Sequence, residues 1–185
     1  GEVNTENLLK KLVTLIMQNS GAGKAILLLK EEDHFSVRAV AVSDQADFQM
    51  PDSNNYLSYP DIPHFIINKV ITEKISINCE NIKKSTFESE EEYLRQHHIK
   101  SFLCMPITWK NKLQGILYLE NRYMEGAFSK NKLSLLELIA TQFASAFETA
   151  RLYSNIEQSE AKFRTLVDNL QDGVFIIQDD QIQYV

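Results

Sequence analysis

The most regular hydrophobic pattern lies in the C-terminal third of the sequence. Residues 127–172 contain neither glycine nor proline, a run longer than ordinary globular helices need. Apolar positions step by four and three residues, as on one face of a helix. The first seam is Leu136, Ala140, Phe143, Phe147 and Ala150, and an out-of-phase second seam is Ile156, Glu160, Phe163, Val167 and Leu170. This pattern predicts a long helix with a joint at 151–155.

The two parts of this run are expected to have different roles. Residues 133–147 are interpreted as the cover of a sheet in their own domain, because an amphipathic face must be buried. Residues 152–161 have no evident core nearby, so a parallel dimer contact is predicted there. The side chains assigned to a dimer and signalling helix are Phe143, Phe147, Ala150, Tyr153 and Ile156.

Shorter patterns upstream alternate between helical and strand periods. They predict helices at 7–18 and after Pro63, strands at 25–30, 35–39 and 75–77, and a hairpin made of 101–109 and 113–122. Between them, residues 44–62 are polar and are expected to form a long loop, a feature that is often functional. The order predicts an α+β fold, an antiparallel sheet flanked by helices.

Two short polar motifs predict where helices begin. Ser89 and Glu92 have the spacing of a capping box, and Ser129 is placed to cap the long helix. Phe128 is expected to pack toward Leu133 as a hydrophobic staple.

Charge and composition narrow the function classes. The net charge of -6 argues against a nucleic-acid surface, which needs clustered Lys and Arg. No apolar stretch approaches the roughly 20 residues that span a bilayer, and no secretory signal opens the sequence. Two cysteines fit a reducing compartment better than a disulfide scaffold. We therefore expect a cytoplasmic domain whose parent protein can still be membrane-attached.

No motif predicts catalysis or a metal site. Cys79, His97, His98 and Cys104 lack the spacing of metal ligands. Lys24 follows two glycines, but the first glycine of a phosphate-binding loop is missing. We predict a non-enzymatic domain without a metal.

Residues 100–107, 112–121 and 126–129 resemble the C-terminal half of a GAF domain, particularly those of large bacterial signalling proteins. The N-terminal helix and the strand at 25–30 fit the first half, so the resemblance covers residues 4–152. It implies a GAF-like sheet with a ligand pocket beside the loops 44–62 and 79–98. Strand alternation predicts that Phe102, Cys104 and Tyr118 project into this pocket; the alternative is that all three are packed core.

The resemblance does not identify a cofactor. Some GAF domains attach a bilin through a Cys-His pair, but those places hold Ser89 and Glu90 here, which argues against covalent attachment. The signature of cyclic-nucleotide-binding members is incomplete, because Lys132 and Leu133 occupy its Asp-Glu places.

Residues 163–185 resemble the start of a PAS domain, with 153–162 as a helical linker. Together the resemblances imply a sensory module of a histidine kinase or diguanylate cyclase type protein, as in two-component systems. It would be a homodimer that relays a signal from an unknown small molecule to the downstream PAS and output domains in the same chain. The alternative is a ligand-free GAF scaffold that serves mainly dimerisation.

Overall fold

The computed structural model describes residues 2–43, 47–51, 55–168, 175–178 and 181–184. Its long helices are α1 (Glu2–Ser20), α2 (His64–Glu73) and α5 (Lys130–Asp168), with the short helices α3 (Phe87–Glu90) and α4 (Glu92–Gln96) and the 3-10 turns η2 (Tyr56–Ser58) and η3 (Ile82–Lys84). Its strands are β1 (Lys24–Lys30), β2 (Phe35–Val42), β3 (Asp47–Gln49), β4 (Ile77–Cys79), β5 (Ser101–Trp109), β6 (Lys112–Asn121), β7 (Phe175–Gln178) and β8 (Gln181–Tyr184).

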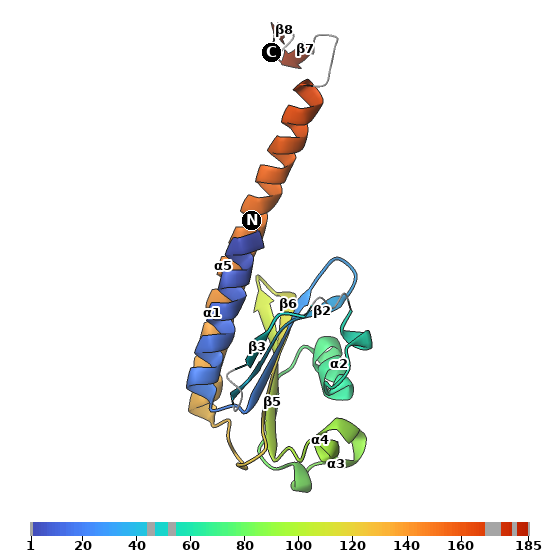
Figure 1. Cartoon of the computed structure of the whole chain (residues 1–185), viewed down its shortest axis with the longest axis vertical. Coiled ribbons are helices and arrows are strands. Elements are labelled where there is room, and N and C mark those ends of the chain that lie inside the picture. The colour runs from blue at the N-terminus through green and yellow to red at the C-terminus, as the bar shows by residue number, and fades with distance from the viewer. Residues whose placement is uncertain (1, 44–46, 52–54, 169–174, 179–180, 185) are drawn as a thin grey trace.

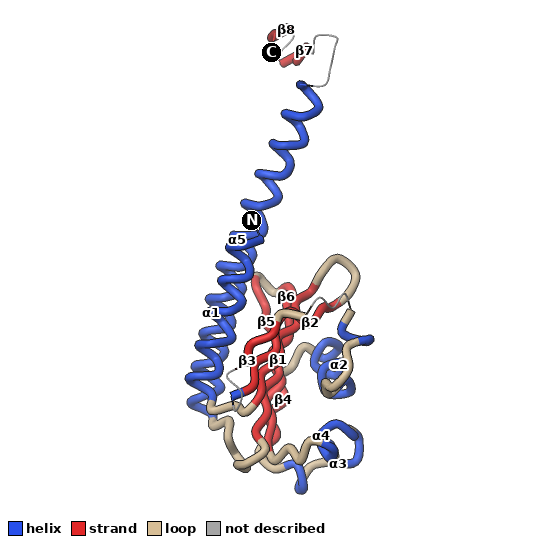
Figure 2. The backbone as a smooth tube through the Cα atoms, in the orientation of Figure 1, coloured by secondary structure: helices blue, strands red, loops and turns tan. Residues whose placement is uncertain are grey.

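Six strands form one antiparallel sheet in the order β3-β2-β1-β6-β5-β4. β1 lies at its centre, and all but its last residue are buried, which explains why this strand is continuously apolar rather than alternating. The predicted α+β fold class is confirmed, and Figures 1 and 2 show its helices on both faces of the sheet.

Each face of the sheet has its own hydrophobic core. On one face α1 and α5 lie side by side, and residues such as Leu9, Leu136 and Phe143 share a core with Leu117 and Leu119 of β6. The opposite face is covered by α2, α3 and α4, and includes Ile66, Leu94, Phe102 and Tyr118 in a second core. A residue's position along a strand therefore decides which layer it contacts.

The predicted hairpin is confirmed in β5 and β6 and turns at Lys110 and Asn111. Both residues have positive φ, 47° and 61°, as a two-residue type I′ turn requires. Gly115 lies inside β6 because a Cβ there would be only 2.4 Å from the carbonyl oxygen of Leu28 on β1. The glycine thus permits the close approach of the two central strands.

The long helix α5 begins directly after Ser129, whose hydroxyl accepts from the Lys132 amide at 3.5 Å. It continues without a break through the predicted joint at 151–155. The change of hydrophobic phase there reflects a change of surroundings rather than an interrupted helix: nothing in the described chain covers the helix beyond Arg151 as the sheet does before it.

One predicted cap is wrong. The cap of α4 is Glu91, whose carboxylate accepts from the Tyr93 amide at 3.4 Å, whereas Ser89 lies inside α3 and bonds the carbonyl of Thr86. Glu91 displaces the predicted cap because its second oxygen also accepts from the Phe65 amide of α2 at 2.9 Å. The cap therefore joins α4 to α2.

The C-terminal segment contains a separate two-stranded sheet. β7 and β8 pair antiparallel, while the residues between α5 and β7, 169–174, lie outside the described part of the chain, as do 44–46 and 52–54 of the predicted loop. The rest of that loop includes β3 and η2, so it is more regular than its sequence indicated.

Candidate functional site

A buried group of polar side chains lies where the first residue of β1 meets the end of β6 and helix α4. Lys24 Nζ donates to the Tyr93 hydroxyl at 2.9 Å, and that hydroxyl donates to Glu120 Oε2 at 2.9 Å. Glu120 has no exposed surface, and the Lys24 side chain is 8% exposed. A buried carboxylate and a buried ammonium group are thus linked through one phenol, in an arrangement that compensates charge inside the fold.

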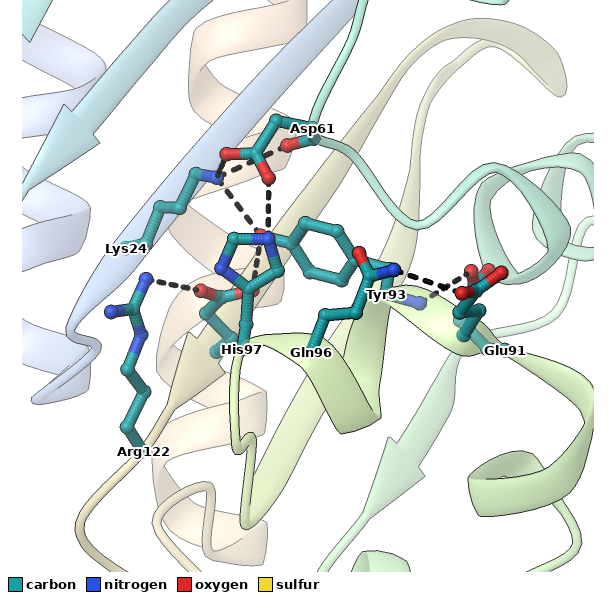
Figure 3. A network of polar contacts seen from close by, with 9 residues as sticks. Lys24, Asp61, Glu91, Tyr93, Gln96, His97 and Arg122 are labelled. Carbon is teal, nitrogen blue, oxygen red and sulfur yellow. Dashed lines mark hydrogen bonds and ion pairs between the residues drawn. The ribbon is translucent and has the colours of Figure 1, made fainter.

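Two further residues cover this group on its outer side. Asp61 accepts from Lys24 Nζ at 3.2 Å through both its carboxylate Oδ2 and its backbone carbonyl. Its other carboxylate oxygen pairs with His97 Nε2. Figure 3 shows the Asp61 carboxylate between these two partners. We call Lys24, Asp61, Tyr93, His97 and Glu120 the Lys24 network.

The elements that carry the network differ in how firmly they hold it. Lys24 and Glu120 face each other across the β1–β6 ladder as register partners. Tyr93 is on α4 and His97 is the C-cap of that helix, and the centroids of their rings lie 4.2 Å apart. Asp61 is on the segment that leads into α2, with a positive φ of 61° and a half-exposed side chain. The donors Lys24 and His97 are therefore held by regular elements, whereas Asp61 lies on the loop segment that covers them.

Burial dominates the electrostatics of the site. It raises the pKa of Glu120 despite the opposing effect of the Lys24 charge and of the Tyr93 hydrogen bond. Burial and the neighbouring Glu120 also raise the pKa of Tyr93, so the phenol stays protonated and able to donate. Arg122 is the other nearby cation, with a guanidinium nitrogen 3.8 Å from Glu120 Oε1.

The predicted pocket residues lie beneath the network in the core between the sheet and helices α2–α4. Phe102, Cys104 and Tyr118 are each fully buried. The rings of Phe102 and Tyr118 stack at 6.0 Å, and burial raises the pKa of the Cys104 thiol. The Tyr118 hydroxyl lies near Glu120 without completing a hydrogen bond. All three side chains thus lie on the face of the sheet that α2–α4 cover, in the second core.

The residues predicted for the dimer and signalling helix do not share a face. Phe143 is buried in the α1–α5 core and stacks on the half-buried Phe147 at 5.4 Å, and Ala150 is partly buried. Tyr153 and Ile156 are exposed, at 68% and 56%. Steps of three residues carry the seam around the helix, so it leaves the packed face as it proceeds.

A different set of apolar residues follows one exposed face of α5. Its members are separated by multiples of the heptad steps of three and four, and each is at least half exposed: Leu138, Leu152, Ile156, Phe163 and Leu166. We call these five residues the outer stripe. It lies opposite the Leu136–Phe143 face that packs on the sheet.

Sequence reasoning missed the Lys24 network because its members are far apart in the sequence. Two of them were discarded for chemistry they lack: Lys24 as part of a phosphate loop and His97 as a metal ligand. The available signal was a charge at the end of each of two apolar strands, Lys24 before 25–29 and Glu120 after 116–119. A charged side chain in a buried sheet is strongly destabilising unless an opposite charge lies next to it, so the two residues were candidates for a pair.

Within the described residues, no group of three or more His, Cys, Asp or Glu side chains is arranged to hold a metal ion. No helix there is long and apolar enough to cross a membrane.

Comparison with known proteins gives a consistent family. The family description "GAF domain" matches residues 4–147. Among curated proteins, hybrid signal transduction histidine kinase G of Dictyostelium discoideum is 38% identical over 50% of this chain and 3% of its own length. A probable 3',5'-cyclic phosphodiesterase of Caenorhabditis elegans is 22% identical over 91% of this chain and 24% of its own length. The chain thus spans a small part of these relatives.

Solved structures show the same fold. The GAF domain region of a putative membrane protein from Geobacter sulfurreducens superposes with a TM-score of 0.62 at 21% identity, covering 80% of this chain and 95% of that one. A GAF domain from Synechocystis in its photoproduct state gives 0.64 at 16% identity, covering 82% and 98%. The GAF domain of a Bacillus halodurans sensor histidine kinase gives 0.53 at 16% identity, covering 79% and 97%.

Proposed function

This chain belongs to the GAF domain family, and we propose that it is a non-enzymatic sensory module of a multidomain signalling protein of the bacterial histidine kinase or diguanylate cyclase type. The module would relay a change at the Lys24 network through α5 to a downstream PAS domain, for which residues 163–185 would be the start. A cytoplasmic location belongs to the same proposal.

The observation that carries this proposal is the alternation of side chains along β6. Tyr118 belongs to the core beneath the Lys24 network, and Glu120 is part of that network. Leu117 and Leu119 belong to the core shared with α5. A shift of β6 is therefore felt in both layers, because closely packed interiors transmit displacement.

The connection from β6 to α5 supports the relay. Asn121, the last residue of β6, donates to the Gly21 carbonyl after α1 at 2.9 Å and accepts from the amides of Tyr123 and Met124. Lys132 in the first turn of α5 donates to Ser20 and Ala127 carbonyls. The end of β6, the end of α1 and the start of α5 are thus hydrogen-bonded into one junction.

For the output we propose a parallel homodimer formed along the outer stripe. Two copies of one stripe match each other in register, as in parallel coiled coils. Replacing Cys79 and Cys104 by serine and introducing Ile156→Cys gives a test: the new thiol should form an intermolecular disulfide under mild oxidation. The matched control is Glu157→Cys on another face of the helix, which should cross-link less. A monomer without cross-linking at position 156 would refute the dimer.

The ligand-free scaffold is the second candidate, favoured by the packed core around Phe102, Cys104 and Tyr118. The two functions differ in whether the network affects α5. In the sensor, Tyr93→Phe should alter the rate of cross-linking through Ile156→Cys, because a few kcal/mol suffice to bias two helix arrangements. In a pure scaffold, the rate should be the same with and without Tyr93→Phe.

A further inference from the structure

We infer that the Lys24 network contains a binding seat for the carboxylate of a small molecule, and that the Asp61 carboxylate occupies this seat in the structure described here. Lys24 and His97 form the seat, and Asp61 is its exchangeable occupant. The inference rests on the proposed sensory function and gives its ligand a chemical class.

The first argument is the way in which Asp61 is bound. Its Oδ2 accepts from Lys24 Nζ at 3.2 Å and its Oδ1 pairs with His97 Nε2. One donor for each carboxylate oxygen is how proteins commonly hold a carboxylate ligand. These two contacts are to the terminal group of Asp61, so a free carboxylate can reproduce them, whereas the third contact, from Lys24 Nζ to the Asp61 backbone carbonyl, belongs to the chain alone.

The second argument is the difference in burial between donors and acceptor. The side chains of Lys24 and His97 are 8% and 23% exposed, whereas that of Asp61 is 55% exposed. Lys24 is fixed further by the Tyr93 hydroxyl, and His97 by ring contact with Tyr93. Displacement of Asp61 would therefore leave both donors in place and would move a group that is already half in water.

The third argument is the backbone at Asp61. Its φ of 61° lies in the left-handed region, which is uncommon for residues other than glycine and carries a conformational cost. The contacts of the Asp61 carboxylate with Lys24 and His97 help to hold this conformation, and a ligand that takes over those contacts would let the backbone relax. This relief offsets part of the cost of displacing Asp61.

The fourth argument is the charge count, which selects a carboxylate over a phosphate. With the Asp61–His97 contact counted as a hydrogen bond, the positive side chains at the site are Lys24 and Arg122, and the negative ones are Asp61 and Glu120. Without Asp61, one uncompensated positive charge would remain beside the buried Glu120. A single carboxylate restores the balance, whereas a phosphate dianion would add excess negative charge next to Glu120.

Acetate tests the seat directly because it resembles the side chain that Asp61→Ala removes. We expect acetate to raise the melting temperature of Asp61→Ala more than that of the wild type, with sodium chloride of equal ionic strength as the reference. Its affinity for the variant should be at least about tenfold higher, because a tethered competitor acts at a high effective concentration. Equal effects of acetate on Asp61→Ala and the wild type would overturn the inference.

Two matched variants keep the test specific. Asp61→Asn fills the same space without the charge and should respond to acetate no more than the wild type. Adding Lys24→Met to Asp61→Ala should abolish the acetate response, and a persisting response would place acetate elsewhere and overturn the seat.

Phosphate at equal ionic strength should stabilise Asp61→Ala less than acetate, and the reverse order would overturn the carboxylate class. None of these readouts depends on dimerisation or on α5, so the seat and the relay can fail separately.

Discussion

The hydroxyl of Tyr93 on α4 donates a 2.9 Å hydrogen bond to the carboxylate of Glu120 on β6. This bond joins the five-residue helix α4 to a carboxylate with no exposed surface. Because Lys24 donates to the same hydroxyl, Tyr93 is the central member of the Lys24 network.

Tyr93→Phe should lower the free energy of unfolding by about 1–3 kcal/mol, the cost of leaving a buried acceptor without its donor. Urea denaturation at neutral pH measures the change. Tyr153→Phe is the control, since that side chain is 68% exposed on α5, and it should have little effect. Equal effects from the two variants would contradict a structural role for the hydroxyl.

Glu120→Gln should change how stability depends on pH. Burial raises the folded pKa of Glu120 above its ordinary value of 4.5. Below that value the carboxyl is protonated in the folded and unfolded protein alike. As pH rises through the raised pKa, the folded state holds the proton more tightly than the unfolded state, so the contribution of Glu120 to stability falls. The stability of the wild type relative to Glu120→Gln should therefore decrease upward from about pH 4.5 and then level off. The exposed Glu157→Gln serves as the comparison, and a relative stability that increases over this range would contradict the assignment.

Gly115→Ala should destabilise the fold by about 1–3 kcal/mol, as overpacking does. The added Cβ would lie 2.4 Å from the Leu28 carbonyl oxygen and 3.0 Å from a methyl group of Leu29. At Gly23 the nearest atom would be 3.6 Å away, an ordinary contact, so Gly23→Ala is the matched control. Thermal unfolding of both variants tests whether the central strands approach as closely as described.

Phe163→Glu and Phe143→Ala should affect different properties. Phe163 is 58% exposed in the outer stripe, whereas Phe143 is 7% exposed in the core. Phe163→Glu should weaken dimerisation by at least about tenfold, because burying a phenylalanine contributes about 1.5–3 kcal/mol. Phe143→Ala should instead lower the stability of each domain by about 3–5 kcal/mol. Sedimentation equilibrium and chemical denaturation separate the two effects, and unchanged association of Phe163→Glu would exclude it from the interface.

Cys79 and Cys104 should react slowly with thiol reagents in the folded protein. Both are buried, and burial raises the pKa of each thiol, which lowers the thiolate fraction that reacts. The Cys79→Ser variant isolates Cys104, whose modification should follow unfolding as denaturant is added. Rapid modification without denaturant would show that the core around Phe102 and Tyr118 opens readily.

Local patterns predicted the elements of this fold well because nearby residues determine them. The hairpin at Lys110 and Asn111 and the start of α5 after Ser129 both depend on local chemistry. The cap of α4 was mispredicted because Glu91 is selected by a distant bond to the Phe65 amide as well as by its own helix.

The Lys24 network could not be assembled from the sequence for a similar reason. Lys24, Asp61 and His97 are brought together by the sheet register and by the path of the chain before α2, neither of which leaves a local pattern. On α5 the periodicity was visible, but two faces carry apolar residues, and only the position of the sheet shows that Phe143 faces inward while Ile156 faces outward.

The pairing of Lys24 with Glu120 in the centre of the sheet also has a consequence for biosynthesis. β1 leaves the ribosome early, but its partner β6 is the last of the six strands to be made. Until then β1 can pair only with β2, and the backbone N–H and C=O groups on its other edge stay without their partners in β6. We expect the nascent domain to remain unable to close its sheet until β6 has emerged, with this open edge as the part most in need of a chaperone.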